Sequence, residues 1–264
     1  FVQWVGRLFG VHFLHVANQK QLTGRFNNHL KNALLVFCDE GFWAGDKSSA
    51  GVLKSMVTDP YVMIEPKGKD AFAVKNHINL IMASNENWVV PAGLEERRFA
   101  VLDVSDIFRN DYSYFEALDN EMKNGGLEAM LYDLLEVQVD MKALRKIPKT
   151  PALFEQKVAS MSLVQKYWYS RLSEANNDFF GKWNYSKKLW NDFITFCDEM
   201  GQRNYRGFDK EFFKQLKNIC PEIKRKRKTY HETGKQEWGY EIPDLFFCRN
   251  SFETCLEMEV DWDI

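Results

Sequence analysis

The chain lacks the marks of several protein classes. No stretch approaches the roughly eighteen consecutive apolar residues of a membrane-spanning helix, and no signal peptide is visible. The five cysteines are odd in number and show no C-x-x-C spacing, which argues against a disulfide framework or a zinc ribbon. There is no internal repeat or low-complexity segment. We therefore expect no membrane partner and a reducing, cytoplasmic location.

What the chain does contain is enough apolar surface for a large core. It has 264 residues, of which 45% are hydrophobic and 15% aromatic, so we expect one large domain or two ordinary ones. The net charge of -2 hides an uneven distribution. Between Arg203 and Lys235 there are 11 basic and 4 acidic residues, whereas the last twelve residues carry 5 acids and no base. This asymmetry indicates one basic face on a nearly neutral protein.

An apolar run, Leu34 to Cys38, is followed directly by Asp39 and Glu40. Such a run predicts a central strand of a parallel sheet, buried on both faces. Two carboxylates at its end should lie at the carboxyl edge of the sheet, where open α/β folds bind ligands. In nucleotide hydrolases the first acid orders Mg²⁺ and the second polarises the attacking water. The alternative is a strand that ends in acids at a solvated rim.

Three further stretches follow in order. A hairpin over 61–75 carries Lys67 and Lys69 at its tip, and a second buried strand over 78–85 ends at Asn85, whose amide could orient a water or touch a phosphate. Arg97 and Arg98 precede a predicted third strand, Phe99 to Val104. Both pairs of cations also have a purely structural explanation: the lysines can keep a sheet edge soluble, and the arginines can form a salt-bridged corner.

Apolar periodicity predicts the remaining elements of the first half: helices over 1–9, 18–32 and from about residue 48 to 58, a strand over 11–16, and a helical stretch over 112–141 broken at residues 124–126. The order strand, helix, strand indicates parallel pairing. Pro148 and Pro151 suggest a boundary. We predict a first domain over 1–143, a linker over 144–152, a second domain over 153–250 and a loose acidic tail over 251–264.

The second domain is predicted to be mostly α-helical, with a helix over 154–175 and two more beginning at Ser186 and Asp209. A basic hairpin over 223–242 follows, which favours a winged-helix domain. Its first strand contains Lys224, Arg225, Lys226, Arg227 and Lys228. Alternating cations beside Tyr230 and Trp238 favour nucleic acid as a partner, although a charge run can also be only a solvated face.

Taken in order, these stretches resemble the motif succession of superfamily 3 helicases, nearest to the helicase part of phage and plasmid primase-helicases and phage primase-polymerases. The likeness spans roughly residues 1 to 104. It rests on the strand ending in Asp39-Glu40, on the segments 53–59, 65–70 and 80–85, and on Glu95-Glu96-Arg97-Arg98-Phe99. It implies an α/β, AAA+-like P-loop NTPase core with a parallel central sheet, truncated here and followed by the winged helix.

The resemblance also implies roles. Asp39 and Glu40 match the Walker B pair, which would order Mg²⁺ and activate water for ATP hydrolysis, and Asn85 matches the sensor of the γ-phosphate. Lys67 and Lys69 match the hairpin that grips single-stranded DNA inside a ring, expected to be a homo-hexamer. Arg97 or Arg98, with Arg98 preferred, would be the arginine finger that reaches the nucleotide of the neighbouring subunit.

One motif of that family is missing. No G-x-x-x-x-G-K-[ST] loop, which would hold the phosphates through its backbone amides and lysine, occurs in the chain. Because residues 1–9 keep helical spacing from the first residue, we expect the loop to precede this segment, with a primase or polymerase domain further upstream. The preferred hypothesis is thus part of an ATP-dependent DNA helicase or translocase in phage or mobile-element replication. The alternative is a non-catalytic DNA-binding or replication-initiation module with a degenerate ATPase scaffold.

Overall fold

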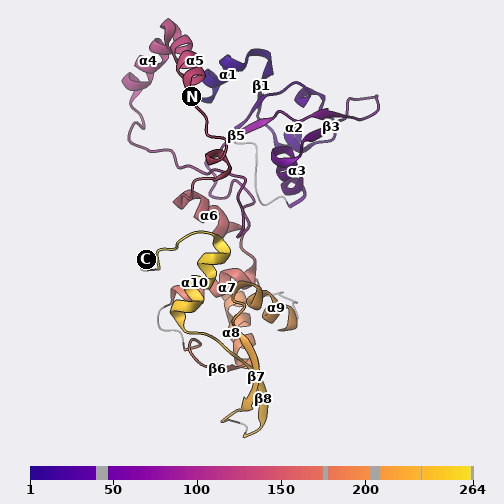
Figure 1. Ribbon diagram of the computed structural model, residues 1–264, viewed down its shortest axis with the longest axis vertical. Helices are drawn as coiled ribbons and strands as arrows, with labels where there is room; N and C mark the ends of the chain where they lie inside the picture. Colours follow the sequence, from indigo (N-terminus) through magenta and orange to yellow (C-terminus); the bar gives the residue numbers. More distant parts are fainter. Residues whose placement is uncertain (40–46, 175–177, 203–208, 233, 263–264) are drawn as a thin grey trace. The chain divides into compact units, whose positions relative to one another are not determined.

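The computed structural model describes residues 1–39, 47–174, 178–202, 209–232 and 234–262 (Figure 1). Contacts divide the chain into two units, one comprising residues 1–92 and 96–156 and the other residues 93–95 and 157–264. The predicted linker, 144–152, lies within the first unit, where it contains the end of a 3-10 turn, Ala143–Arg145, and the start of helix α6, Pro151–Ser160. None of the described helices is long and apolar enough to cross a membrane.

The first unit is built on a three-stranded parallel sheet in the order β1-β2-β5, with bounds Phe13–Val16, Leu35–Asp39 and Asn79–Ala83. The predicted central strand is confirmed. Strand β2 pairs on both sides, and its residues Leu35 to Cys38 are buried. The register sets Asp39 opposite Ala83, so the ends of β2 and β5 lie at one edge of the sheet, the edge that the parallel pairing predicts.

Helices and a hairpin surround this sheet. The helix predicted over 1–9 is confirmed as α1, Val2–Phe9. It ends at Gly10, which has a φ of 52°. Helix α2 is only Gln19–Thr23, with Asn18 as its N-cap, and a 3-10 turn, Asn28–Leu30, replaces the rest of the helix expected over 18–32. Helix α3 spans Lys47–Thr58, and the predicted hairpin forms from β3, Tyr61–Ile64, and β4, Phe72–Lys75.

The expected third strand over residues 99–104 is wrong. These residues have no strand partner in the described part of the chain. The carbonyl of Val101 instead accepts a hydrogen bond from the hydroxyl of Thr150, whose Oγ1 also accepts from the N–H of Leu153 in the first turn of α6. The backbone is thus fixed to a helix start and not to a sheet edge.

The predicted helical stretch over 112–141 forms α4, Tyr112–Glu121, and α5, Leu127–Glu136, joined by a π-helical turn, Met122–Gly126. The predicted break is confirmed, because Asn124 and Gly125 leave helical geometry, and Gly125 has a φ of 103°. A positive φ of this kind suits glycine, which has no Cβ.

The second unit contains α7, β6, α8, α9, β7, β8 and α10 in that order. Their bounds are Leu163–Ser173, Trp183–Tyr185, Ser186–Glu199, Asp209–Ile219, Lys224–Thr229, Gln236–Glu241 and Leu245–Leu256. The strands form one antiparallel sheet in the order β6-β8-β7. Aromatic residues dominate the core, where Phe193 and Phe212 stack with ring centroids 4.5 Å apart and Tyr167 meets Phe193 edge-on.

Two predictions for this unit need correction. The single helix expected over 154–175 is two helices, because Ser162 begins α7 with a capping box: its Oγ accepts from Gln165 N–H, while the Gln165 side chain accepts from Ser162 N–H. The prediction of a loose tail from residue 251 onward is wrong for residues 251–256. Helix α10 continues to that residue, with Phe252 and Leu256 buried in the core.

Candidate functional site

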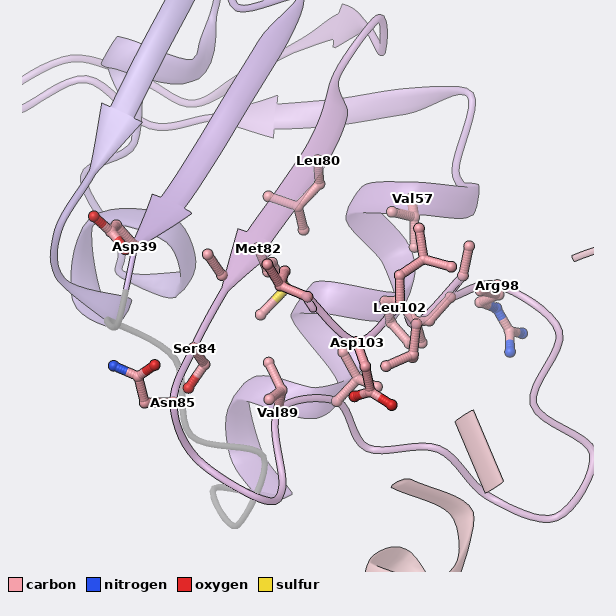
Figure 2. Close-up of a pocket in the computed structure, with 16 residues that line it drawn as sticks. Asp39, Val57, Leu80, Met82, Ser84, Asn85, Val89, Arg98, Leu102 and Asp103 are labelled. Carbon is pink, nitrogen blue, oxygen red and sulfur yellow. The ribbon is translucent and has the colours of Figure 1, made fainter. Parts of the chain in front are cut away.

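A pocket of about 740 Å³ lies at the carboxyl edge of the parallel sheet. Asp39 at the end of β2 and Ser84 and Asn85 just after β5 line one side of it, and the segment from Arg98 to Val104 lines another. Figure 2 shows Asp39 and Asn85 on the same side of the pocket, below the ends of their strands. Parallel pairing thus brings together two residues that are 46 positions apart in the sequence.

Asp39 keeps access to solvent, since 47% of its side chain is exposed. Its Oδ2 lies 3.9 Å from Nε2 of His15 on the neighbouring strand β1, and the His15 ring stacks on Phe37 with centroids 5.1 Å apart. The sequence analysis assigned no role to His15 and did not connect it with Asp39. The signal was available only through the β1–β2 register, which sets His15 opposite Phe37. Glu40, the predicted water-activating acid, lies outside the described residues.

The oxygen-bearing side chains at the carboxyl edge of the sheet could hold Mg²⁺ if a substrate supplied further ligands. No cluster of three or more His, Cys, Asp or Glu side chains that could hold a metal occurs among the described residues. Mg²⁺ is commonly bound by only one or two carboxylates together with substrate phosphates. A half-exposed carboxylate beside an amide and a hydroxyl, Asn85 and Ser84, fits that requirement.

The arginine turn is organised by a buried carboxylate, Glu96, whose side chain is only 2% exposed. Its Oε1 accepts from the backbone N–H of Arg97 at 3.0 Å and of Arg98 at 2.8 Å, and lies 3.4 Å from Arg98 Nη1. Its Oε2 lies 3.5 Å from Nζ of Lys54 on α3. Sequence reasoning missed Glu96. The available signal was its place directly before the two arginines, where a carboxylate can accept from the next two N–H groups.

The two arginines differ in position. Arg98 lines the pocket, and Figure 2 shows its guanidinium on the side away from Asp39 and Asn85. Arg97 is exposed and is not among the residues that line the pocket. The Glu96–Arg98 contact is the salt-bridged corner that the sequence offered as an alternative, and the exposed part of Arg98, 36% of its side chain, leaves it able to contact a further group.

Lys67 and Lys69 lie exposed in the turn between β3 and β4, as predicted for a hairpin tip. Gly68 between them has a φ of 74°, which the turn requires. The start of this turn is held by Asn27, whose side chain donates to the carbonyl of Met63 and accepts from the N–H of Glu65. The lysines do not line the pocket at the sheet edge. They form a separate basic point on the first unit.

The basic strand β7 lies at the edge of the second sheet with all six residues exposed. Its cations divide between the two faces of the strand. Lys224, Lys226 and Lys228 share the face of Glu241, which pairs with Lys226 and, at 3.4 Å, with Lys228. Hydrogen bonds from Lys226 and then Lys228, together with their charges, hold the pKa of Glu241 below its usual range. On the other face, Arg225 stacks over Trp238 at 4.4 Å and Arg227 donates to the carbonyl of Gln236.

Known proteins share parts of this sequence and of this fold. The profile of a family of unknown function (DUF5906) matches residues 1–98. The DNA primase-polymerase of Nitratiruptor phage NrS-1 is 29% identical over 127 residues, which cover 45% of this chain and 18% of that protein. Two apo structures of the NrS-1 C-terminal region match with TM-scores of 0.68 and 0.66 at 19% and 18% identity.

Each of these structural matches covers 91% of this chain and 63% of the NrS-1 region. The chain therefore shares its mixed α/β fold with that region, and its sequence match covers less than a fifth of the primase-polymerase.

Proposed function

We propose that this chain forms the nucleotide-hydrolysing and adjoining DNA-binding parts of a superfamily 3 helicase or translocase that acts in DNA replication of a phage or related mobile element. The observation that carries the proposal is the meeting of Asp39 and Asn85 at the carboxyl edge of a parallel sheet, beside a pocket of about 740 Å³. Similarity to a phage primase-polymerase supports the replication setting.

In this proposal Asp39 holds Mg²⁺ together with the phosphates of ATP, and Mg²⁺ when bound neutralises charge that develops on the transferred phosphoryl group. Glu40 accepts the proton of the attacking water, and Asn85 orients that water from the end of β5. Glu96 fixes the backbone that carries Arg98, so that the guanidinium loses little conformational entropy when it contacts a phosphate.

Because the guanidinium of Arg98 points away from Asp39, we propose that it serves the nucleotide of a neighbouring subunit in a homo-oligomeric ring, expected to be a hexamer. Arg97 remains the alternative finger. Lys67 and Lys69 would face single-stranded DNA in the channel of the ring, where lysine contacts to phosphate carry no sequence information. A primase or polymerase domain upstream in the same protein completes the proposal.

The second unit is proposed to be a winged-helix domain. The support is its element order, α7-β6-α8-α9-β7-β8, with a three-stranded antiparallel sheet in the order β6-β8-β7. Its basic strand, Lys224 to Lys228, would add a salt-sensitive DNA contact.

Mixing two inactive variants of the full-length protein tests the arrangement. Asp39→Asn removes the metal ligand and Arg98→Ala removes the finger, so each ring alone should lack ATP turnover. In mixed rings, an interface with Asp39 from one variant and Arg98 from the other is complete, and random mixing restores about a quarter of the sites. Mixtures that assemble and remain inactive would show that Arg98 does not act between subunits. Arg97→Ala in the same assay separates the two arginines.

The alternative is a non-catalytic DNA-binding or replication-initiation module. The absence of a G-x-x-x-x-G-K-[ST] loop from these 264 residues favours it. Full-length protein that binds DNA but shows no nucleotide binding, measured with a fluorescent ATP analogue, would support this alternative over the motor.

A further inference from the structure

A groove of about 690 Å³ lies between helix α9 and the β7–β8 hairpin of the second unit. Four cations line it, Lys210, Lys214 and Lys217 from α9 and Arg225 from β7, against one acid, Asp209. All of these residues are exposed. The sequence analysis considered Arg225 only as part of the run on β7 and counted the three lysines only among the 11 cations between Arg203 and Lys235.

The lysines share one face of α9 because they are four and three residues apart. The opposite face of the helix is fixed in the core by Phe212, Leu216 and Ile219. At a rise of about 1.5 Å per residue, the three lysines extend over roughly 10 Å, which is about the axial span of four successive phosphates on one strand of a duplex. The lysine row therefore has the length and the rigidity of a backbone contact.

The charges in the groove are available, in contrast to those on the other face of β7. None of the four cations forms an ion pair with another described residue, whereas Lys226 and Lys228 share Glu241. The Arg225 guanidinium is braced by the ring of Trp238. An unpaired lysine can replace the counterions of a phosphate, while a lysine already paired with a carboxylate gains less.

The floor of the groove favours a duplex over a single strand. Its two rings, Phe213 and Tyr240, stack on each other at 4.0 Å and are 6% and 7% exposed. Sites for single strands gain much of their energy from bases stacked on accessible rings. Buried rings cannot supply this, so phosphate contacts remain the main source of binding energy.

We propose that the groove between α9 and β7–β8 binds the sugar–phosphate backbone of double-stranded DNA through Lys210, Lys214, Lys217 and Arg225. This deepens the proposed function by assigning the duplex, as distinct from the single strand in the ring channel, to a defined face of the second unit. The site is testable without ATP, so that its failure would leave the proposed ATPase untouched.

The test measures binding of this 264-residue chain to a fluorescent duplex of arbitrary sequence by anisotropy, over a series of salt concentrations. The variant is Lys214→Ala, Lys217→Ala, Arg225→Ala. The matched control removes three other cations of the same unit that do not line the groove, Lys166, Lys182 and Lys188. Circular dichroism checks that both variants are folded, as expected for positions that are exposed or, in the case of Lys166, half-buried.

Each lost phosphate contact lowers the slope of log affinity against log salt by about 0.9, so the variant should lose roughly 2 to 3 units of slope and on the order of a hundredfold in affinity near 0.1 M salt. The control should stay within about threefold of the wild type, since it loses charge but no contact. A variant slope equal to that of the wild type, or a control that loses as much as the variant, would overturn the proposal. So would a larger loss for a single strand of the same length than for the duplex.

Discussion

Replacing Glu96 should loosen the arginine turn more than any surface change nearby. Glu96→Ala leaves the N–H groups of Arg97 and Arg98 without their acceptor, and because both hydrogen bonds are only part-buried, each lost acceptor should cost about 1–1.5 kcal/mol. The contacts with Lys54 and Arg98 add at most about 1 kcal/mol each, since both cations are more than one third exposed and screened by water. We expect a total loss of about 2–5 kcal/mol for Ala.

Glu96→Gln keeps one oxygen for the two N–H groups but turns an amide donor toward Lys54, so its cost should be about 1–2 kcal/mol. Two units in one chain can unfold in separate steps, and a denaturation curve reports the stability of a whole unit and not of one turn. Amide hydrogen exchange of the peptide containing Arg97 and Arg98 reads the local effect directly, with about tenfold faster exchange for each 1.4 kcal/mol lost.

The matched control is Glu95→Gln, an exposed acid in the same turn, which should leave exchange unchanged within about twofold. If the amides of Arg97 and Arg98 exchange at the wild-type rate in Glu96→Ala, the carboxylate does not organise the turn. The role given to Glu96 in holding Arg98 would then have to be withdrawn.

Three further changes test other parts of the fold. Ser162→Ala removes the capping box of α7 and should lower the free energy of unfolding by about 1 kcal/mol in urea denaturation, while Ser173→Ala at the other end of the helix should change it by less than about 0.5 kcal/mol. Lys157→Met leaves the carbonyls of Leu94 and Leu256 without their Nζ donor and should lower the free energy of unfolding by about 2–4 kcal/mol. An unchanged melting temperature would contradict this prediction. Glu241→Gln frees two lysines of β7 and should raise the affinity for duplex DNA severalfold at low salt. The pKa of Glu241 is lowered in the fold, so its contribution to stability is present above its unfolded pKa of about 4.3 and is lost as the pH falls through the lower folded value. A pH series of thermal melts can follow this loss.

The sequence predicts those elements that have strong local signals. The buried run of β2 and the Pro-Lys-Gly-Lys turn of the β3–β4 hairpin carry their own periodicity and turn chemistry, and both form as expected. The break in the α4–α5 stretch follows from adjacent glycines. These features need no information from distant parts of the chain.

The errors come from contacts between distant residues. Residues 99–104 have the apolar content of a strand, yet Thr150 takes the hydrogen bond that a strand would use. Strand β6 is three residues long and forms only because β8 passes beside it, where Gly239 leaves room for the Trp183 ring. The end of helix α10, from residue 251, is predicted to be an acidic tail because the sequence does not show that Phe252 and Leu256 are buried in the core.

The candidate site shows the same division. Asp39 and Asn85 follow from the rule that parallel strands end at one edge, and the register of β2 and β5 bears out that placement. The contribution of Glu96, the approach of His15 and the separation of the β7 cations onto two faces all depend on tertiary contacts. Spacing along the sequence does not encode them.

ATP turnover by the full-length protein in the presence of single-stranded DNA tests the central claim most directly. Asp39→Asn removes the proposed metal ligand, and Asp59→Asn, an exposed acid outside the pocket, is its charge-matched control. We predict a loss of at least about a hundredfold in turnover for Asp39→Asn and less than about twofold for Asp59→Asn. Wild-type turnover in Asp39→Asn would contradict the assignment of nucleotide hydrolysis to this edge of the sheet.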